Sequence, residues 1–351
     1  MMRLKKIFLI FLSRLSALAI LIIPALFSAF ASTNPPVDDV QMGTLLDDEI
    51  SWLQAESVIY SAARREQLIM DTASAVFVIS NEDIRRSGVR SVPEALRRVP
   101  GLNVAQINAN VWAISSRGFN DRTANKLLVM IDGRTVYNPI FSGTIWRTKD
   151  VLLEDVDRIE VIRGPGASLW GANAVNGVIN VITKRAENSE GLYATGGGGN
   201  QERGFGAVRY GGKIGAKTSY RGYVKYNNRA SNKLVSGMDA QDNWENLQGG
   251  FRMDGSPNPE NSWTLQGDIY TGNGGGLVNN TAPVPPFSFP DDRKENFAGG
   301  NILGRWNHTF SDTSAMSLQM YYDRTEDKST STVLNNNYLQ SIINTFDIDF
   351  Q

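Results

Sequence analysis

Few residues of this 351-residue chain could do chemistry. Cysteine is absent and His308 is the single histidine, so thiolate catalysis, disulfides and thiolate-built zinc sites are excluded. The sequence shows no metal-ligand constellation and no catalytic set of nucleophile, base and acid. We therefore predict that the chain is not an enzyme and holds no cofactor and no metal. His308 falls at the end of a strand-like run and is interpreted as structural.

One stretch has the residue types of a ligand loop. It reads RIEVIRGPGASLWGANAVNGVINVITK and runs from Arg158 to Lys184. Its segment 164–171 superficially resembles a phosphate-binding glycine loop, but it lacks the Lys-Ser/Thr end of such a loop and the Gly-x-Gly-x-x-Gly spacing of a dinucleotide fold. Pro165 also removes one backbone donor. Nucleotide binding is therefore not expected. The 35 Lys+Arg against 36 Asp+Glu give no case for a nucleic-acid partner either.

The elements around this stretch predict a compact α+β domain. Strand-like runs cover residues 75–79, 111–115, 126–131, 159–162 and 178–182. Asn81 and Ser91 are candidate N-caps of two short helices, and Asp132-Gly133 predicts a tight turn. The domain is expected to span residues 73–184.

The pattern changes after Lys184. Apolar and polar residues alternate strictly over 247–254, 263–270, 316–323 and 346–351, as in strands with one apolar face. A soluble sandwich would also bury one face. Short turns, however, alternate with long polar loops, expected over 228–244 and 272–295, and this is typical of transmembrane β-barrels. Residues 185–351 are therefore predicted to be antiparallel barrel strands in contact with outer-membrane lipid.

The first 31 residues have the layout of a secretory signal peptide. A basic start precedes an apolar run, and a small-x-small site predicts cleavage after Ala31. An N-terminal membrane anchor is the alternative, because the apolar run 15–30 is fairly long. Residues 32–72 are predicted to form a flexible leader.

Several motifs resemble those of the TonB-dependent outer-membrane receptors. The stretch 158–184 is similar to the signature of the family's plug domain, and so are VPEALRRVPGLNV (92–104), ISSRGF (114–119) and LLVMIDGRTVY (127–137). The resemblance implies a plug threaded into a barrel of about 22 strands. It also implies uptake of scarce ligands, mostly ferric siderophores and cobalamin. Because about eight strands are expected after the plug, we expect the chain to be the N-terminal part of a longer receptor or a truncated gene product.

The resemblance implies a docking peptide for a periplasmic partner. In the family, the protein TonB adds as a β-strand to a short apolar box before the plug. The best match to this box is Glu56, Ser57, Val58, Ile59, Tyr60, Ser61 and Ala62. A plain first strand of the plug is the alternative.

Residues at the plug–barrel contact are also implied. Arg117 and Arg163 match two plug arginines that meet barrel carboxylates in the family, although both could be ordinary solvated charges. Gly164 and nearby glycines allow close approach to a curved wall. Trp170 is expected to anchor the segment in an apolar recess. Asn173 and Asn176 can satisfy backbone groups buried away from water.

The plug apex is expected to face an extracellular chelate ligand. Its candidate residues are Asn108, Asn110, Trp112, Tyr137, Asn138, Phe141 and Trp146. The four aromatic side chains could stack on a flat chelate or could belong to the plug core. The default ligand is a ferric siderophore or another metal chelate, taken up by a transporter that couples to TonB. A passive receptor or adhesin, and uptake of cobalamin or an oligosaccharide, remain alternatives.

Overall fold

The structure is a computed structural model of the chain. It describes residues 58–61, 64, 67–69, 72, 74–171, 173–281, 283–285, 287–311, 313–331 and 338–351. All of these lie in one compact unit, Glu56–Gln351. The expected signal peptide and most of the expected leader lie outside the described residues, as do Glu56, Ser57 and Ala62 of the expected box. None of the helices in the described ranges is long and apolar enough to cross a membrane.

A five-stranded mixed sheet organises the first part of this unit. Its order is β3 (Val76–Ser80), β8 (Val156–Ile162), β9 (Gly177–Thr183), β6 (Leu127–Ile131) and β7 (Arg134–Thr135). β6 and β9 are parallel, and the other pairs are antiparallel. Two small sheets pair β4 (Leu102–Gln106) with β5 (Trp112–Ser116) and β1 (Val58–Ile59) with β2 (Gln67–Leu68). The strands expected in this region all form, whereas β4 was not expected.

Short helices connect the strands. They are α3 (Asn81–Ser87), α4 (Val92–Leu96), α5 (Ala167–Trp170) and the 3-10 turns η2 (Trp146–Thr148), η3 (Leu153–Asp155) and η4 (Ala186–Ser189). The N-cap of α3 is Ser80, one residue before the expected Asn81. Ser80 Oγ accepts from the backbone of Asp83, and the Asp83 carboxylate accepts in return from Ser80, which forms a capping box. Ser91 caps α4 as expected.

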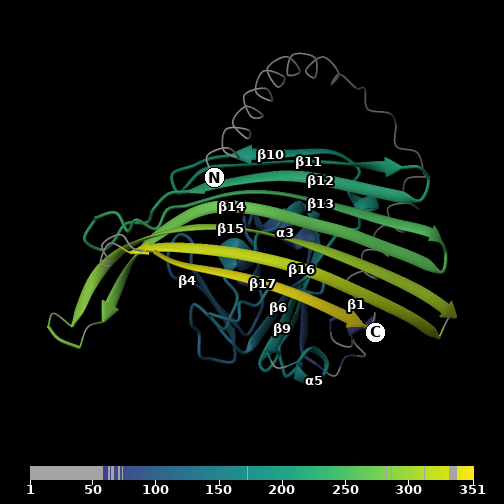
Figure 1. Cartoon of the computed structure of the whole chain (residues 1–351), viewed down its shortest axis with the longest axis horizontal. Helices are drawn as coiled ribbons and strands as arrows, with labels where there is room; N and C mark the ends of the chain where they lie inside the picture. Colours follow the sequence, from purple (N-terminus) through teal and green to yellow (C-terminus); the bar gives the residue numbers. More distant parts are fainter. Residues whose placement is uncertain are drawn as a thin grey trace, which may run out of the picture. The chain divides into compact units, whose positions relative to one another are not determined.

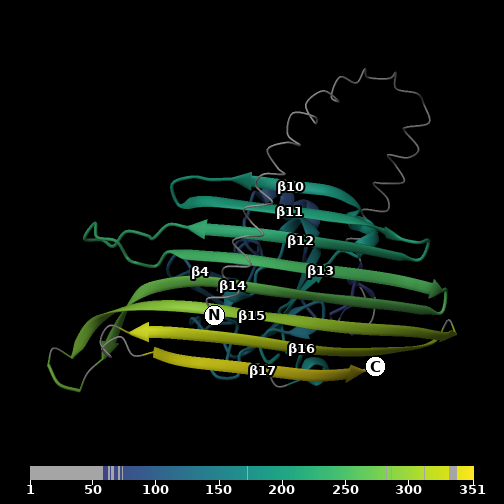
Figure 2. The ribbon, with the colours of Figure 1, turned by 45° about the horizontal axis from the view of Figure 1, so that its top comes forward.

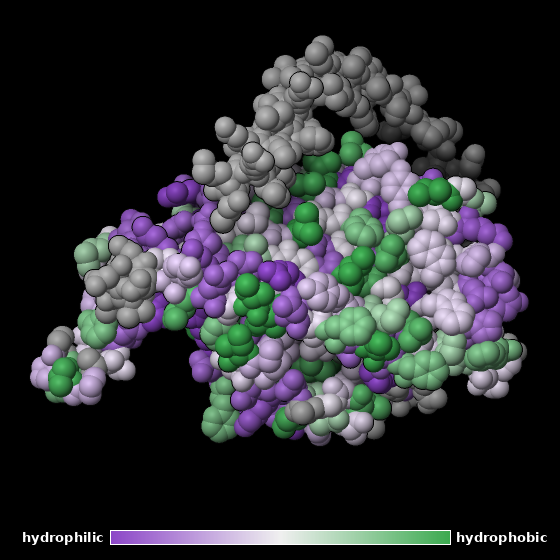
Figure 3. All heavy atoms as spheres, in the orientation of Figure 1, coloured by the Kyte–Doolittle hydropathy of each residue, from purple (hydrophilic) through white to green (hydrophobic). Residues whose placement is uncertain are grey.

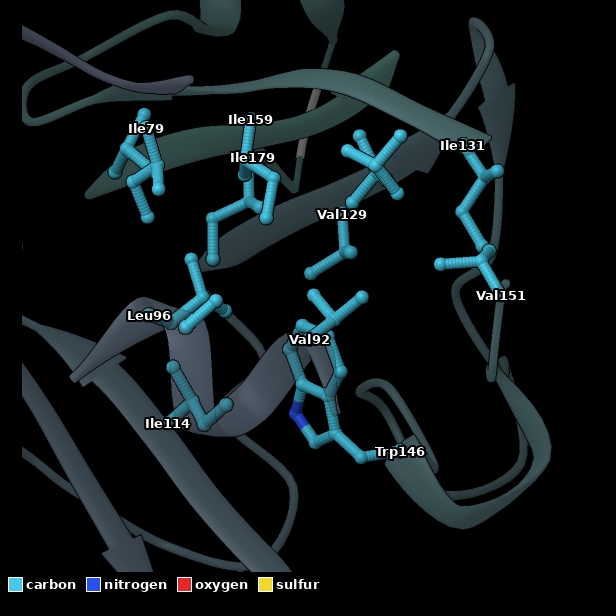
Figure 4. Close-up of a cluster of buried hydrophobic side chains, with 14 of the residues drawn as sticks. Ile79, Val92, Leu96, Ile114, Val129, Ile131, Trp146, Val151, Ile159 and Ile179 are labelled. Atoms are coloured by element: carbon cyan, nitrogen blue, oxygen red, sulfur yellow. The ribbon is translucent and has the colours of Figure 1, made fainter. Parts of the chain in front are cut away.

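The core lies between α4 and the five-stranded sheet. Figure 4 shows Leu96 of α4 facing Ile179 of β9 and Val92 of α4 facing Val129 of β6. All four side chains are almost fully buried, and burial of each such side chain stabilises the fold by about 1.5–3 kcal/mol. This core holds β8 and β9 rigid, and these two strands carry the residues described below.

An eight-stranded antiparallel sheet forms the second part of the unit. Its strands follow one another in chain order: β10 (Gly191–Gly197), β11 (Glu202–Ile214), β12 (Thr218–Arg229), β13 (Trp244–Asn258), β14 (Asn261–Thr281), β15 (Ser288–Ser311), β16 (Ser314–Ser331) and β17 (Tyr338–Phe350). Figures 1 and 2 show it as one curved sheet lying across the plug strands. β10 and β17 each have one neighbour, so the barrel wall is partial and unclosed. The expected fold class, an α+β plug followed by antiparallel barrel strands, is confirmed.

The two ends of this sheet differ in their connections. Turns at one end are short, as between β13 and β14, whereas connections at the other end are long, as between β12 and β13. One expected loop is wrong: residues 272–295 are mostly strand, because β14 and β15 continue as a hairpin paired as far as Thr281 and Ser288. Glycine and asparagine residues in β14, and charged residues with Pro290 in β15, hid this extension, since these residue types do not favour strands.

Gly177 shows why the 158–184 stretch needs glycine. A Cβ at Gly177 would press on the carbonyl oxygen of Ile162 in the neighbouring strand β8. Gly171 ends α5 at φ 86°, where side chains are strained. The nearest neighbour of a Cβ at Gly164 would be Arg117 of the plug, at 3.7 Å. In the described residues, these close approaches are made within the plug.

We predict that Gly177→Ala destabilises the plug by about 1–3 kcal/mol, because the added methyl group overpacks the β8–β9 contact. Denaturant unfolding of the purified chain, followed by tryptophan fluorescence, measures the change. Gly204→Ala is the matched control, since a Cβ at Gly204 meets nothing within 4 Å. Equal stability of the two variants would contradict the packing argument.

Candidate functional site

The described part of the expected TonB box is docked on the plug. Ile59 and Ser61 are fully buried. The carboxylate of Glu160, itself fully buried in β8, accepts from the backbone N–H of Tyr60 at 3.1 Å and from that of Ser61 at 2.7 Å. Bonds from backbone amides to a carboxylate are about twice as strong as neutral ones. Glu160 therefore holds the segment by its backbone, with little demand on its side chains.

Two further groups hold Ser61. Asn180 of β9 donates from Nδ2 to Ser61 Oγ at 3.0 Å, and Trp170 of α5 donates from Nε1 to the Ser61 carbonyl at 2.7 Å. Asn180 pairs in register with Glu160, so both lie on one face of the central strands. We call Glu160, Asn180 and Trp170 the latch.

The negative charge of the latch is compensated inside the plug. Arg158 donates from Nε to Glu160 at 2.8 Å and pairs with Asp157 at 2.7 Å. Burial disfavours the charged form of Arg158, but the carboxylates of Glu160 and Asp157 outweigh burial, so the pKa of Arg158 lies above its ordinary value. Both oxygens of the buried Glu160 carboxylate therefore accept hydrogen bonds, from the backbone of the segment and from Arg158.

The segment also reaches the barrel wall. Arg64 pairs with Asp349 of β17 at 3.0 Å, and its guanidinium lies 4.5 Å from the centre of the Trp170 ring. The Tyr60 hydroxyl donates to Gln351. The end of β17 pairs with the start of β16, so these contacts lie at the short-turn end of the wall. Trp170 is half-buried. Besides Ser61 and Arg64 it contacts an apolar cluster of the plug, which consists of Leu128, Met130, Ile162, Ala174 and Val178.

Ion pairs fill the seam between plug and wall. Asp155 of the plug lies 2.6 Å from Arg209 and 3.3 Å from Arg221, and Asp150 lies 2.7 Å from Lys225. All these side chains are buried or nearly so. The wall cations stand on the inward positions of β11 and β12, opposite the apolar outward positions.

Plug cations meet wall carboxylates at other points of the seam. Arg147 pairs with Glu295 and, at 2.8 Å, with Asp327. Arg134 pairs with Asp323. The sequence analysis did not identify these residues. Two features of the sequence indicate them: the charged segment 146–150 and the charged residues at the inward positions of the alternating strands.

Arg117 and Arg163 lie away from this seam. Arg117 donates to the Arg163 carbonyl at 3.1 Å, and Arg163 donates to the Pro100 carbonyl at 2.8 Å. Both acceptors belong to the plug. Asn176 donates to the Ser116 carbonyl, also inside the plug, and Asn173 is half-buried in the turn before β9.

The apex loop is tied to the wall by Asp242. The Asp242 carboxylate, buried in the β12–β13 connection, accepts from Ala109 N at 2.8 Å and from Asn232 N at 2.7 Å. Asn110 donates to the carbonyls of Asp242 and Gly275, both at 2.9 Å. Asn108 Oδ1 accepts from Asn110 N and closes the loop.

The aromatic apex candidates divide into two groups. Trp112 and Trp146 are core residues with about 5% and 7% exposure, which leaves little ring surface for a ligand. Phe141 is exposed and Tyr137 is half-buried. Asn138 is buried, and its Oδ1 caps the backbone of Ile140 and Phe141.

Comparison with known proteins identifies the plug. Residues 69–178 match the family described as TonB-dependent Receptor Plug Domain. The chain is similar to a vitamin B12 transporter of Vibrio vulnificus, 34% identical over 46% of this chain and 27% of that protein. It is also similar to an iron-regulated outer membrane virulence protein of Vibrio cholerae, 35% identical over 37% of this chain and 20% of that protein. The chain thus spans about a quarter of the length of the curated relatives it matches.

Solved structures share the fold. The ferric enterobactin receptor of Pseudomonas aeruginosa superposes with a TM-score of 0.58 at 17% identity, covering 77% of this chain and 45% of that one. The ferripyoverdine receptor of the same organism superposes with a TM-score of 0.59 at 16% identity, covering 78% and 37%. The chain therefore carries the plug domain of the TonB-dependent receptors, followed by antiparallel strands that share the fold of the barrels of these receptors.

Proposed function

We propose that the protein takes up a scarce, bulky ligand across the outer membrane with energy supplied through TonB, and that it is not an enzyme. The observation that supports this proposal is the docked segment 58–61, which belongs to the expected box and whose contacts with the wall lie at the short-turn end. In transmembrane barrels, short turns face the periplasm. The segment is therefore on the side where a periplasmic partner can reach it.

The latch suits a segment that must be held and then pulled. β1 pairs with β2 over two residues, so the segment has little ladder of its own. Its anchor is Glu160 on β8, beside Asn180 on β9. Force applied to the segment would therefore act on the two central strands of the plug. TonB would gain its grip by strand addition, which relies on backbone hydrogen bonds.

The polar seam suits a plug that must stay closed yet yield. Breaking a buried ion pair by removing one partner costs roughly 3–5 kcal/mol, so the seam resists leakage. When the plug leaves the wall, both members of an ion pair can be hydrated. The separated faces of an apolar interface would instead be exposed to water unfavourably. Arg117 and Arg163 are proposed to add to this retention in the whole receptor by meeting wall carboxylates there.

The ligand is proposed to be a metal chelate, with a ferric siderophore as the default. Cobalamin uptake is a second candidate, favoured by the similarity to curated vitamin B12 transporters. The exposed Phe141 and the half-buried Asn108 are proposed to face the ligand, whereas Asn110 is buried and its amide is bound to the carbonyls of Asp242 and Gly275.

We expect Ile59→Pro to abolish uptake while surface binding of the ligand persists. Proline removes a backbone donor and bends the strand that TonB must pair with. Transport and binding assays with a labelled chelate in cells expressing the full-length receptor separate the two effects. Ile59→Val, which keeps the strand, is the control. Unchanged uptake by the proline variant would favour the passive receptor or adhesin.

We expect Glu160→Gln to free the docked segment. The chain lacks cysteine, so a single Ser61→Cys reports accessibility without background. Bonds to a charged acceptor contribute about 1.5–3 kcal/mol, so thiol labelling should accelerate about tenfold or more in the Gln variant. Asp157→Asn is the matched control, since Asp157 also forms an ion pair with Arg158 but makes no described contact with the segment. Equal labelling in all backgrounds would rule out the latch.

We expect Arg147→Ala to loosen the plug. Glu295 and Asp327 would lose their guanidinium partner, at a cost of roughly 3–5 kcal/mol if both stay dry. Sensitivity of cells to a large antibiotic should rise at equal receptor levels. Arg85→Ala, which breaks an exposed pair with Glu82, should change nothing measurable. An Arg147 variant as tight as the parent would show that this pair does not retain the plug.

A further inference from the structure

The outer face of the wall carries a groove between β14, β15 and β16. It has a volume of about 470 Å³ and is open along the face that points away from the plug. Its apolar lining includes Ile269, Ile302 and Tyr322, which are 73%, 48% and 41% exposed. Figure 3 views this face and shows hydrophobic residues over the middle of the strands. The groove therefore opens into the hydrocarbon region that surrounds a barrel.

Small residues make the floor of the groove. Gly300 of β15 pairs in register with Ile269 on one side and Arg324 on the other. Ala298, two residues along the same face, pairs with Glu326. A Cβ at Gly300 would meet the Asp268 carbonyl at 2.8 Å and the Ile269 side chain at 3.1 Å. The hollow is thus fixed by sequence, because a larger residue at Gly300 would displace the backbone.

One end of the groove is charged. The outward positions of β16 are apolar as far as Tyr322 and then become Arg324, Glu326 and Lys328. Among the described residues, Arg324 makes one hydrogen bond, 3.3 Å long, to Asn344 and a loose contact of 3.6 Å with Glu326. Glu326 is also engaged by Gln340 at 2.8 Å. The guanidinium, with about half of its side-chain surface exposed, has donors left for an anion.

This charged end lies toward the long connections of the sheet, which face the exterior in transmembrane barrels. The groove therefore presents an apolar channel at membrane depth and a cation at the level of the outer-leaflet headgroups. A planar guanidinium with free donors matches the geometry of a phosphate group.

We propose that this groove binds one acylated lipid with a phosphorylated headgroup from the outer leaflet. An acyl chain lies over Gly300 and Ala298, between Ile269 and Ile302. Arg324 holds the phosphate, with Lys328 adding a second positive charge and Glu326 limiting the site to a single anionic group. The site is separate from the ligand path through the plug.

Native mass spectrometry of the full-length receptor in neutral detergent tests the proposal. The probes are dimyristoyl phosphatidic acid and dimyristoylglycerol, which share chains and differ in the phosphate. The parent should bind the phosphatidic acid more tightly. Arg324→Ala should weaken that binding about fivefold, the effect of one basic residue at a headgroup, and leave dimyristoylglycerol unchanged. Ala298→Leu, which fills the floor, should weaken both.

Lys213→Ala is the charge-matched control. Lys213 is an exposed cation on another strand, at the short-turn end of β11, so its removal should have no effect. Excess inorganic phosphate should not displace the phosphatidic acid, since the acyl chain supplies part of the affinity. Equal binding by the parent and Arg324→Ala would overturn the headgroup assignment. Equal binding by the parent and Ala298→Leu would overturn the groove itself.

Discussion

A wall that faces lipid on one side must carry its polar side chains on the other. Each strand of the eight-stranded sheet alternates, so the outward set is apolar and the inward set includes Arg209, Arg221, Lys225 and Arg252, all buried. Buried charges need partners. The plug supplies them from its turns, chiefly Asp132, Asp150 and Asp155. The position of the plug thus follows from the amphipathic pattern of the wall.

The same requirement shapes the plug interior. Glu160 is buried on a central strand, where its charge must be met by donors that come from Arg158 and from the backbone of the docked segment. Because the backbone of the docked segment donates to this carboxylate, the segment supplies hydrogen bonds that a buried group of the plug requires. Its departure would leave a buried acceptor with fewer donors, so docking and plug order are energetically linked.

Local pattern predicted most of the fold. The strict alternation in β13, β14, β16 and β17, and the apolar runs of β6, β8 and β9, are periodic enough to place strands from sequence alone. The β14–β15 hairpin escaped because the glycine and asparagine residues of β14 and the charged residues of β15 form strand here by pairing across the hairpin, and neither run favours strand by itself. The site was harder to predict. Trp112 and Trp146 have the side chains of a stacking site but are buried, and burial is a tertiary property. Glu160 meets Ser61 across 99 residues of sequence, Asp155 meets Arg209 across 54, and Arg147 meets Asp327 across 180, which is beyond the reach of any local motif.

Asp242 has a consequence for how such receptors diversify. Its carboxylate joins the β12–β13 connection to the backbone of Ala109 in the plug, and its carbonyl receives Asn110. The β12–β13 connection and the plug apex therefore form one hydrogen-bonded unit, although 133 residues of sequence separate Asp242 from Ala109. If that loop were exchanged between two receptors, the backbone N–H of Ala109 and the side chain of Asn110 would lose their hydrogen-bond acceptors unless residues 108–110 were exchanged with it. Recombination that replaces this surface loop must therefore also replace the plug residues that bind it.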